Sequence, residues 1–473
     1  MRSFYDSNGD GIGDLRGLTQ KLDYIAGLGA DCVWLMPVAE SPSYHGYDVT
    51  DYYKVEPDYG TNDDFKAFVA AAHRHHIRVL VDLVLNHTSS EHPWFQEALR
   101  DTASPHRNWY RWSHTAGSNW HESPLRDEYY FGLFWSGMPD LNYENPAVLE
   151  EMKRVARYWL DSMHVDGFRL DAVRHLVEVG NEVSNTPGTH QVLREFGQYV
   201  RSIAPQSYTI GEVWDNTDVI LTYYPDQLDA YFAFPISEAL MEAVRTGKAG
   251  GLIPTVEQFE RAEPTLRWAP FQRNHDQTRT MTALRNDTAG ARLAVTILLT
   301  LPGVPFIYYG EEIGMTGDKP DERLRTPMQW DRARSAGFTK GKPWEALQPD
   351  SFSANVAVEN RNPNSLLNLY RRLMRLRGTH SALRTGSLAP LPVGNDAVLA
   401  YLRGNNDYWL LVVANLSNTT VTGVSLPTPG LFTLRPLLGG RTINRTRVLP
   451  PLAPRQAYIY ELTGFEFTKH TSP

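Results

Sequence analysis

Short apolar runs alternate with longer amphipathic segments along most of the chain. Continuous β-branched and leucine-rich runs predict buried parallel strands, and apolar positions three and four residues apart predict helices. The pattern predicts strands at the very N-terminus and at residues 32–35, 78–85, 165–170, 208–210, 228–232, 268–271 and 306–309. It predicts helices at residues 63–75, 147–163, 192–203, 237–244 and 292–300. Eight alternating strand–helix units predict an α/β fold, a closed (β/α)8 TIM barrel.

Two parts of the chain depart from this alternation. Residues 88–145 follow the third strand and are too long for an ordinary loop, so we expect a small inserted domain there. The last part of the chain changes to short alternating strands, separated by Gly and Pro, which predicts an antiparallel β domain. The expected organisation is a barrel of residues 1–87 and 146–385, an inserted domain of residues 88–145, and a C-terminal β-sandwich domain of residues 386–473.

Composition excludes several classes of protein. Hydrophobic residues make up 42% and charged residues 21%, which is ordinary for a globular protein with a large core. The net charge is −8 without a basic tract, which argues against nucleic acid or anionic lipid as a partner. The longest apolar stretch, residues 293–301, is too short for a bilayer, so no membrane insertion is expected. The single cysteine, Cys32, excludes an internal disulfide framework and a cysteine-based zinc site.

Three carboxylates follow predicted strands of the barrel: Asp171, Glu212 and Asp276. Catalytic groups of a parallel barrel lie at the carboxyl ends of its strands, so we expect the three to converge. A lone carboxylate at a strand end is commonly an ion-pair partner, but three together with basic neighbours point to chemistry. Converging like charges raise at least one pKa, as a general acid at neutral pH requires. The basic neighbours are Arg169, His87 and His275.

Five motifs resemble those of the α-amylase family of glycoside hydrolases. In chain order they are residues 82–87 (DLVLNH), 138–142 (MPDLN), 167–175 (GFRLDAVRH), 211–214 (GEVW) and 271–276 (FQRNHD). The resemblance runs through nearly the whole chain, and the motifs occur at suitable positions of the predicted barrel. It implies an α-glucan or maltooligosaccharide as substrate.

The resemblance also implies a retaining double displacement. Asp171 would be the nucleophile, Glu212 the acid and then the base, and Asp276 the group that holds sugar hydroxyls in the transition state. Arg169 would keep Asp171 ionised, because a neighbouring cation lowers the pKa of a carboxyl group. The implied substrate-binding residues are Tyr47, which would stack beneath the sugar ring, with His87, Arg169, Arg174, His175 and His275.

The specificity signals point in two directions. Residues 6–14, 325–330 and 336–338 resemble exo-acting oligosaccharide glucosidases and trehalose synthases. Those enzymes commonly carry Asp three residues before the stacking tyrosine, where this chain has Tyr44, as endo-acting α-amylases do. We therefore expect an intermediate member, between α-amylases or neopullulanases and oligo-1,6-glucosidases. It would be an endo-acting α-1,4-glucan hydrolase that degrades starch, with some transglycosylation.

Two other functions stay open at this stage. One is an exo-acting α-glucosidase or trehalose synthase, which residues 325–330 favour and Tyr44 opposes. The other is a non-catalytic barrel that serves as a binding module. Relatives of that kind lose catalytic carboxylates, whereas this chain retains all three.

The loop of residues 6–14 predicts a cation site. Oxygen-bearing side chains at alternating positions, with glycine between them, suit a hard cation such as Ca²⁺. A solvated turn held by its own Asp and Asn side chains is the alternative. The resemblance implies that the ligands are the side chains of Asp6, Asn8, Asp10 and Asp14 and the carbonyl of Ile12.

The start of the chain is short beside the family pattern. Family members normally carry further residues there, including most of the first strand, so we expect a truncated chain or a short first strand. Localisation is not readable from the sequence, and the protein would be secreted if the missing segment carried a signal. We expect a monomer.

Overall fold

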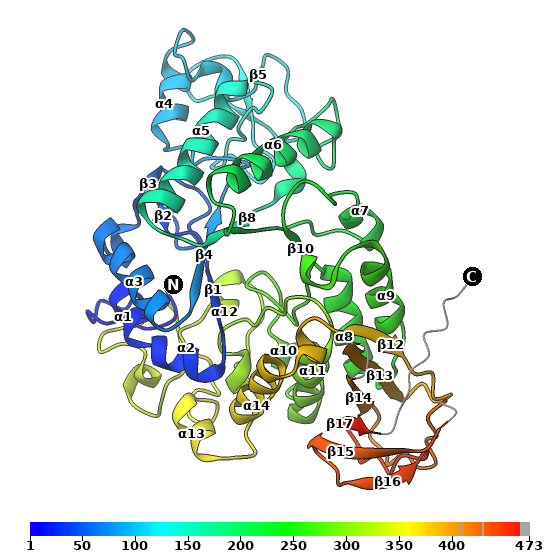
Figure 1. The fold of residues 1–473 in the computed structure, drawn as a ribbon. Coiled ribbons are helices and arrows are strands. Elements are labelled where there is room, and N and C mark those ends of the chain that lie inside the picture. The colour runs from blue at the N-terminus through cyan, green and yellow to red at the C-terminus, as the bar shows by residue number, and fades with distance from the viewer. Residues whose placement is uncertain (406–407, 428–429, 464–473) are drawn as a thin grey trace. The chain divides into compact units, whose positions relative to one another are not determined.

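The computed structural model describes residues 1–405, 408–427 and 430–463 (Figure 1). The chain divides into two compact units. The first unit comprises Met1–Trp214, Asp218–Phe232 and Phe338–Trp344. The second comprises Asp215–Thr217, Ala233–Gly337 and the chain from Glu345 onward. Each unit is described by itself.

A parallel sheet forms the centre of the first unit. Its strands lie in the order β1 (Cys32–Leu35), β4 (Arg78–Leu83), β8 (Gly167–Leu170), β9 (Tyr208–Gly211) and β10 (Ala230–Phe232). All four residues of β8 and the last five of β4 are buried, as continuous apolar strands of a covered parallel sheet should be. The predicted strands at these five places are confirmed.

Helices follow the strands of this sheet, beginning where the sequence places capping residues. Helix α3 (Asn62–Arg74) starts in a capping box between Thr61 and Asp64. Helix α5 (Pro146–Arg157) starts at the Asn145 cap with proline in its first turn. The predicted helices at residues 63–75, 147–163 and 192–203 are confirmed, the second continuing as a π-helical turn over Tyr158–Ser162. The other helices are α1 (Leu15–Gln20), α2 (Leu22–Leu28), α6 (Pro187–Ile203) and α7 (Thr217–Leu221).

The segment after β4 builds a small structure of its own. It contains α4 (Pro93–Arg100) and a three-stranded antiparallel sheet in the order β5 (Trp112–Ser113), β7 (Tyr129–Phe131) and β6 (Trp120–Glu122). Aromatic rings form its core: the ring centroid of Phe95 lies 5.0 Å from that of Tyr110 and 4.9 Å from that of Tyr130. A short pair, β2 (Ala39–Glu40) and β3 (Asp51–Val55), precedes this segment.

The second unit is mainly helical before its terminal sheet. The predicted helices at residues 237–244 and 292–300 are confirmed as α8 (Phe234–Thr246) and α11 (Thr288–Thr300), and β11 (Trp268–Ala269) lies between them in the chain. The remaining helices are α9 (Leu252–Ala262), α10 (Thr280–Ala283), α12 (Asp321–Leu324), α13 (Val356–Arg361), α14 (Leu366–Thr379) and α15 (Ser381–Arg384). Of the helices in the described ranges, none is long and apolar enough to cross a membrane.

Two predicted strands are not formed as expected. The chain turns at the N-terminus instead, where the amide of Phe4 donates to the carbonyl of Met1, and residues 1–14 contain no strand. The segment at residues 306–309 makes a single parallel bridge, between Phe306 and Phe271. The amides of Val304 and Phe306 donate to the carbonyls of Trp268 and Pro270 at 2.9 Å, so only a short parallel ladder forms here.

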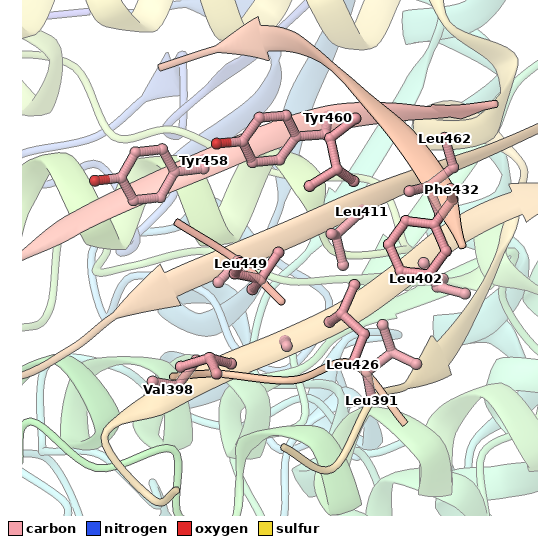
Figure 2. Packing of buried hydrophobic residues seen from close by; sticks show 14 of the residues in the cluster. Leu391, Val398, Leu402, Leu411, Leu426, Phe432, Leu449, Tyr458, Tyr460 and Leu462 are labelled. Carbon is pink, nitrogen blue, oxygen red and sulfur yellow. The ribbon is translucent and has the colours of Figure 1, made fainter. Parts of the chain in front are cut away.

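An antiparallel sheet ends the described chain, which agrees with the predicted terminal β structure. Its order is β12 (Ser387–Pro390), β13 (Val398–Asn405), β14 (Tyr408–Asn415), β17 (Gln456–Thr463), β15 (Phe432–Leu438) and β16 (Ile443–Thr446). Figure 2 shows the apolar core on this sheet, in which Leu402, Leu411 and Tyr460 are almost fully buried.

Candidate active site

One buried guanidinium in the first unit holds three carboxylates. The Nη1 atom of Arg169 donates to both carboxylate oxygens of Asp82 at 2.9 Å and to Oδ1 of Asp171 at 2.5 Å. Its Nη2 atom lies 2.7 Å from Oε2 of Glu212. The Arg169 and Asp82 side chains are inaccessible to solvent, and those of Asp171 and Glu212 are nearly so. The structure therefore brings together Asp171, Glu212 and Arg169, as the sequence predicts, and adds Asp82.

Strand register explains this arrangement. Asp82 of β4 and Arg169 of β8 are paired residues of the parallel sheet, so their side chains leave the sheet side by side. Asp171 and Glu212 directly follow β8 and β9, and their amides continue the ladder by donating to Leu83 and Leu170. The three carboxylates thus meet at the carboxyl edge of the sheet, where catalytic groups of such folds lie.

The backbone turns sharply after Asp171. Ala172 adopts a left-handed conformation with φ 45° and ψ 36°, which costs a residue with a side chain about 1–3 kcal/mol. In this conformation the amide of Ala172 donates to Oε2 of Glu212 at 3.2 Å. The turn after Asp171 therefore bonds the backbone at Ala172 to the carboxylate of Glu212.

Burial sets the electrostatics of the cluster. Burial raises the pKa of Asp82 to about 7, although the Arg169 charge opposes that rise. Burial by itself would lower the pKa of Arg169, but the facing charges of Asp82 and Glu212 outweigh it and hold that pKa well above its usual value. Arg169 consequently stays charged at all ordinary pH values, whereas Asp82 changes charge near neutrality.

His87 lies beside this cluster in a neutral form. It is almost completely buried, and burial lowers its pKa to about 4. Among the residues that the structure describes, none is a hydrogen-bond partner for its Nε2 atom. A buried ring nitrogen of this kind can bind a hydroxyl of a ligand.

An aromatic ring covers His87 and His175. The Phe134 ring centroid lies 5.3 Å from that of His87 and 6.0 Å from that of His175, both in edge contacts. Phe134 is 48% exposed, although its neighbour His87 is buried. The sequence reasoning missed Phe134; the available signal was an aromatic residue four positions before the motif at residues 138–142.

The other predicted binding residues of this unit differ in their contacts. The Tyr47 hydroxyl donates to Oδ2 of Asp82 at 3.1 Å, so Tyr47 belongs to the cluster. His175 bonds the Val183 carbonyl through Nδ1, and burial lowers its pKa. Arg174 donates to the carbonyl of Trp214 at 2.6 Å and so anchors the loop after β9.

The second unit positions Asp276 through an arginine. Nη2 of Arg325 lies 2.7 Å from Oδ1 of Asp276, and Nε of Arg325 donates to the carbonyl of His275 at 3.1 Å. Nε2 of His275 lies 3.2 Å from Oδ2 of Asp276. Asp276 is therefore a held but partly accessible carboxylate, with 30% of its side chain exposed. Arg325 had no predicted role, although it begins the motif at residues 325–330.

Backbone amides donate hydrogen bonds to the carboxylates of the loop at residues 6–14. Asp6 accepts from the amides of Asn8, Gly9 and Gly11 at 2.7–3.0 Å. Asp10 accepts from Ile12, and Asp14 from Ser7 and Gly17. Within the described part of the chain, no group of three or more His, Cys, Asp and Glu side chains is placed to hold a metal ion. The loop has the donor chemistry for Ca²⁺, and its carboxylates accept from backbone amides in this conformation.

Comparison with known proteins identifies the family. The family model for the alpha-amylase catalytic domain matches residues 1–386. Alpha-amylase 3 of Dictyoglomus thermophilum is 43% identical over 429 residues, which cover 88% of this chain and 83% of that protein. The trehalose synthase/amylase of Mycolicibacterium smegmatis is 38% identical over 468 residues, covering 85% of this chain and 78% of that protein.

A solved structure extends the likeness to the whole fold. The crystal structure of an alpha-amylase from H. orenii has a TM-score of 0.86 and 37% identity, and the match covers 98% of each chain. The predicted fold class, a (β/α)8 barrel with a C-terminal antiparallel β domain, is thereby confirmed. The chain belongs to the alpha-amylase family and is a glycoside hydrolase of the amylase type, a family whose substrates are glucans.

Proposed function

We propose that this protein is a retaining, endo-acting α-1,4-glucan hydrolase that acts as a monomer on starch and maltooligosaccharides. The observation that carries the proposal is the buried Arg169, which bonds Asp171 through Nη1 and Glu212 through Nη2. Both nitrogens belong to one rigid guanidinium, so the two carboxyl groups are close neighbours. A short separation, about 5–5.5 Å, suits retention, because inversion needs room for a water molecule between the groups.

The first step forms a covalent glycosyl ester. Asp171, held beside the Arg169 cation, attacks the anomeric carbon, and Glu212 protonates the departing glycosidic oxygen. In the second step Glu212 takes a proton from water or from a sugar hydroxyl, which releases the sugar from Asp171. Water gives hydrolysis, and a sugar acceptor gives transglycosylation.

Other residues bind the sugar during both steps. Asp276, oriented by Arg325, accepts hydrogen bonds from sugar hydroxyls. His87 is neutral at working pH and offers its Nε2 atom to another hydroxyl. Tyr47 presents its ring to the sugar, and its hydroxyl is fixed on Asp82.

Tyr44 supports internal rather than terminal cleavage. Its ring stacks on that of Trp344, with centroids 5.4 Å apart and an interplanar angle of 24°. An aromatic pair offers a surface to a longer glucan, whereas a carboxylate at this position would grip a terminal glucose. The alternative, an exo-acting α-glucosidase or trehalose synthase, is favoured by the 38% identity to a trehalose synthase/amylase.

Early products distinguish these activities. We would incubate the protein with maltoheptaose, starch, cyclodextrin and maltose and separate the first products by chromatography. Endo cleavage should lower iodine colour and starch viscosity faster than reducing ends accumulate, and it should act on end-blocked oligosaccharides. Glucose as the only early product, or trehalose from maltose, would replace the proposal by the exo-acting or the isomerising alternative.

We also propose that residues 6–14 bind Ca²⁺. The oxygen-rich donor set of Asp6, Asn8, Asp10 and Asp14 supports this proposal. Each carboxylate that accepts from a backbone amide keeps further lone pairs, so it can bind the cation while the amide bonds hold the loop. Isothermal titration with Ca²⁺ against the metal-free protein tests this directly, and no heat of binding would reject it.

A further inference from the structure

Asp82 is the most deeply buried carboxylate of the cluster. It lies near the end of β4, and its side chain is 0% exposed. Its Oδ2 atom accepts from Nε1 of Trp34 at 3.2 Å and from the Tyr47 hydroxyl at 3.1 Å, in addition to Arg169. Trp34 and Arg169 belong to β1 and β8, the strands on either side of β4. Asp82 is thus fixed from both sides by a rigid sheet.

The charges around Arg169 do not cancel. One guanidinium faces three carboxylates, and Asp82 and Asp171 share the same nitrogen, Nη1. The groups that face Asp82 are Arg169 and Asp171 from β8 and its end, and Tyr47 from the loop before β3. Glu212 lies on the far side of Arg169. Because the cluster is buried, solvent screens these charges weakly, and the charge of each carboxylate affects the others.

We propose that Asp82 is a positioning residue whose negative charge raises the proton affinity of Glu212 through Arg169. Ionised Asp82 accepts hydrogen bonds from Arg169 and partly neutralises its positive charge, and it also repels the negative charges of Asp171 and Glu212. Glu212 then keeps its acidic proton to a higher pH. This inference rests on the proposed roles of Asp171 and Glu212.

The sign of the effect distinguishes this role from mere structural support. In Asp82→Asn the shape remains and the negative charge is lost, so Arg169 pairs more fully with Glu212 and the pKa of Glu212 should fall. The alkaline limb of kcat/KM, where Asp82 is ionised in the wild type, should move to lower pH by about one unit. The acid limb lies where Asp82 is already protonated, so it should stay in place. A purely structural Asp82 would lower the plateau and leave both limbs in place.

The experiment measures each limb with the substrate that isolates it. Kinetics on an α-1,4-glucan report the alkaline limb, where Glu212 loses its proton. Kinetics on an α-glucosyl fluoride report the acid limb, where Asp171 gains one, because fluoride leaves without general acid. The matched control is Glu178→Gln, which removes another buried carboxylate, 2.7 Å from Arg111 and 4% exposed, and should leave both limbs unchanged.

A second variant keeps the test decisive if Asp82→Asn does not fold. Trp34→Phe removes one hydrogen bond from Asp82 and leaves the charge count unchanged. It should raise the pKa of Asp82, leave more of it protonated near neutrality, and move the alkaline limb in the same direction by a smaller amount. Folded Asp82→Asn or Trp34→Phe protein with the alkaline limb at its wild-type position would overturn the inference.

Failure of the proposed function is recognised separately. If wild-type protein does not cleave α-1,4-glucans, or if Asp171→Asn retains activity, the assigned activity or roles are wrong whatever Asp82 does. If another α-glucoside is the substrate, the pH dependence of kcat/KM is measured on that glycoside. A shift of the alkaline limb in Asp82→Asn then supports the inference, and an unshifted limb rejects it.

Discussion

Replacing Glu212 by glutamine separates the two steps of the proposed reaction. In this structure Oε2 of Glu212 meets Nη2 of Arg169 at 2.7 Å and accepts from the Ala172 amide at 3.2 Å. A glutamine carbonyl oxygen can accept both bonds, so the fold and the position of the side chain should be preserved. What is lost is the transferable proton and one negative charge beside Arg169.

The expected loss follows from that difference. General acid catalysis contributes about 10²–10⁴ in rate, which is about 3–5.5 kcal/mol of transition-state stabilisation. Glu212→Gln should lose at least this factor in kcat on an α-1,4-glucan, whose sugar leaving group needs a proton. It should lose far less in the first step with an α-glucosyl fluoride. The ester on Asp171 should then accumulate, because the second step lacks its base.

Intact-mass spectrometry of Glu212→Gln after brief exposure to the fluoride provides the assay. We expect one glycosyl adduct per chain, which peptide mapping should locate on Asp171. Asp171→Asn under the same conditions is the matched control and should form no adduct. An adduct on Asp276, or undiminished glucan cleavage by Glu212→Gln, would refute the assignment.

Four further predictions follow from other parts of the structure. Asp171→Asn should abolish turnover of every glycoside, because no other group forms the ester; steady-state rates above the blank would contradict this. Phe134→Ala should raise KM several-fold with little change in Tm, because the ring covers His87 but is itself half exposed; an unchanged KM would count against it. Glu311 is fully buried beside Tyr370, and burial raises its pKa to about 8, so the folded protein binds a proton that the unfolded chain releases above its ordinary pKa. Its contribution to stability therefore falls as pH rises through that window, by up to about 1.4 kcal/mol per pH unit, and Glu311→Gln should flatten the decline of Tm between pH 5 and 8. Chelation should lower Tm if residues 6–14 bind Ca²⁺; an unchanged Tm together with no calcium by elemental analysis would reject the site.

The sequence by itself determined the features that have a local signature. Continuous apolar runs predicted β4 and β8 because parallel strands are buried on both faces. The motif positions of Asp171 and Glu212 at strand ends predicted their convergence, since the carboxyl ends of parallel strands share one edge. The N-terminal strand and the full strand at residues 306–309 were wrongly predicted, because a short apolar run does not reveal how far a partner strand extends its ladder.

Only the tertiary structure decided which groups surround the catalytic pair. Asp82 and Arg169 are 87 positions apart in the chain, and the register of β4 on β8 places them side by side. Phe134 reaches His87 from the segment inserted between those strands. Such contacts have no local pattern. They arise from strand register and close packing, which minimise the free energy of the whole unit. The same packing buries Asp82, which raises its pKa and strengthens the effect of its charge on the neighbouring carboxylates.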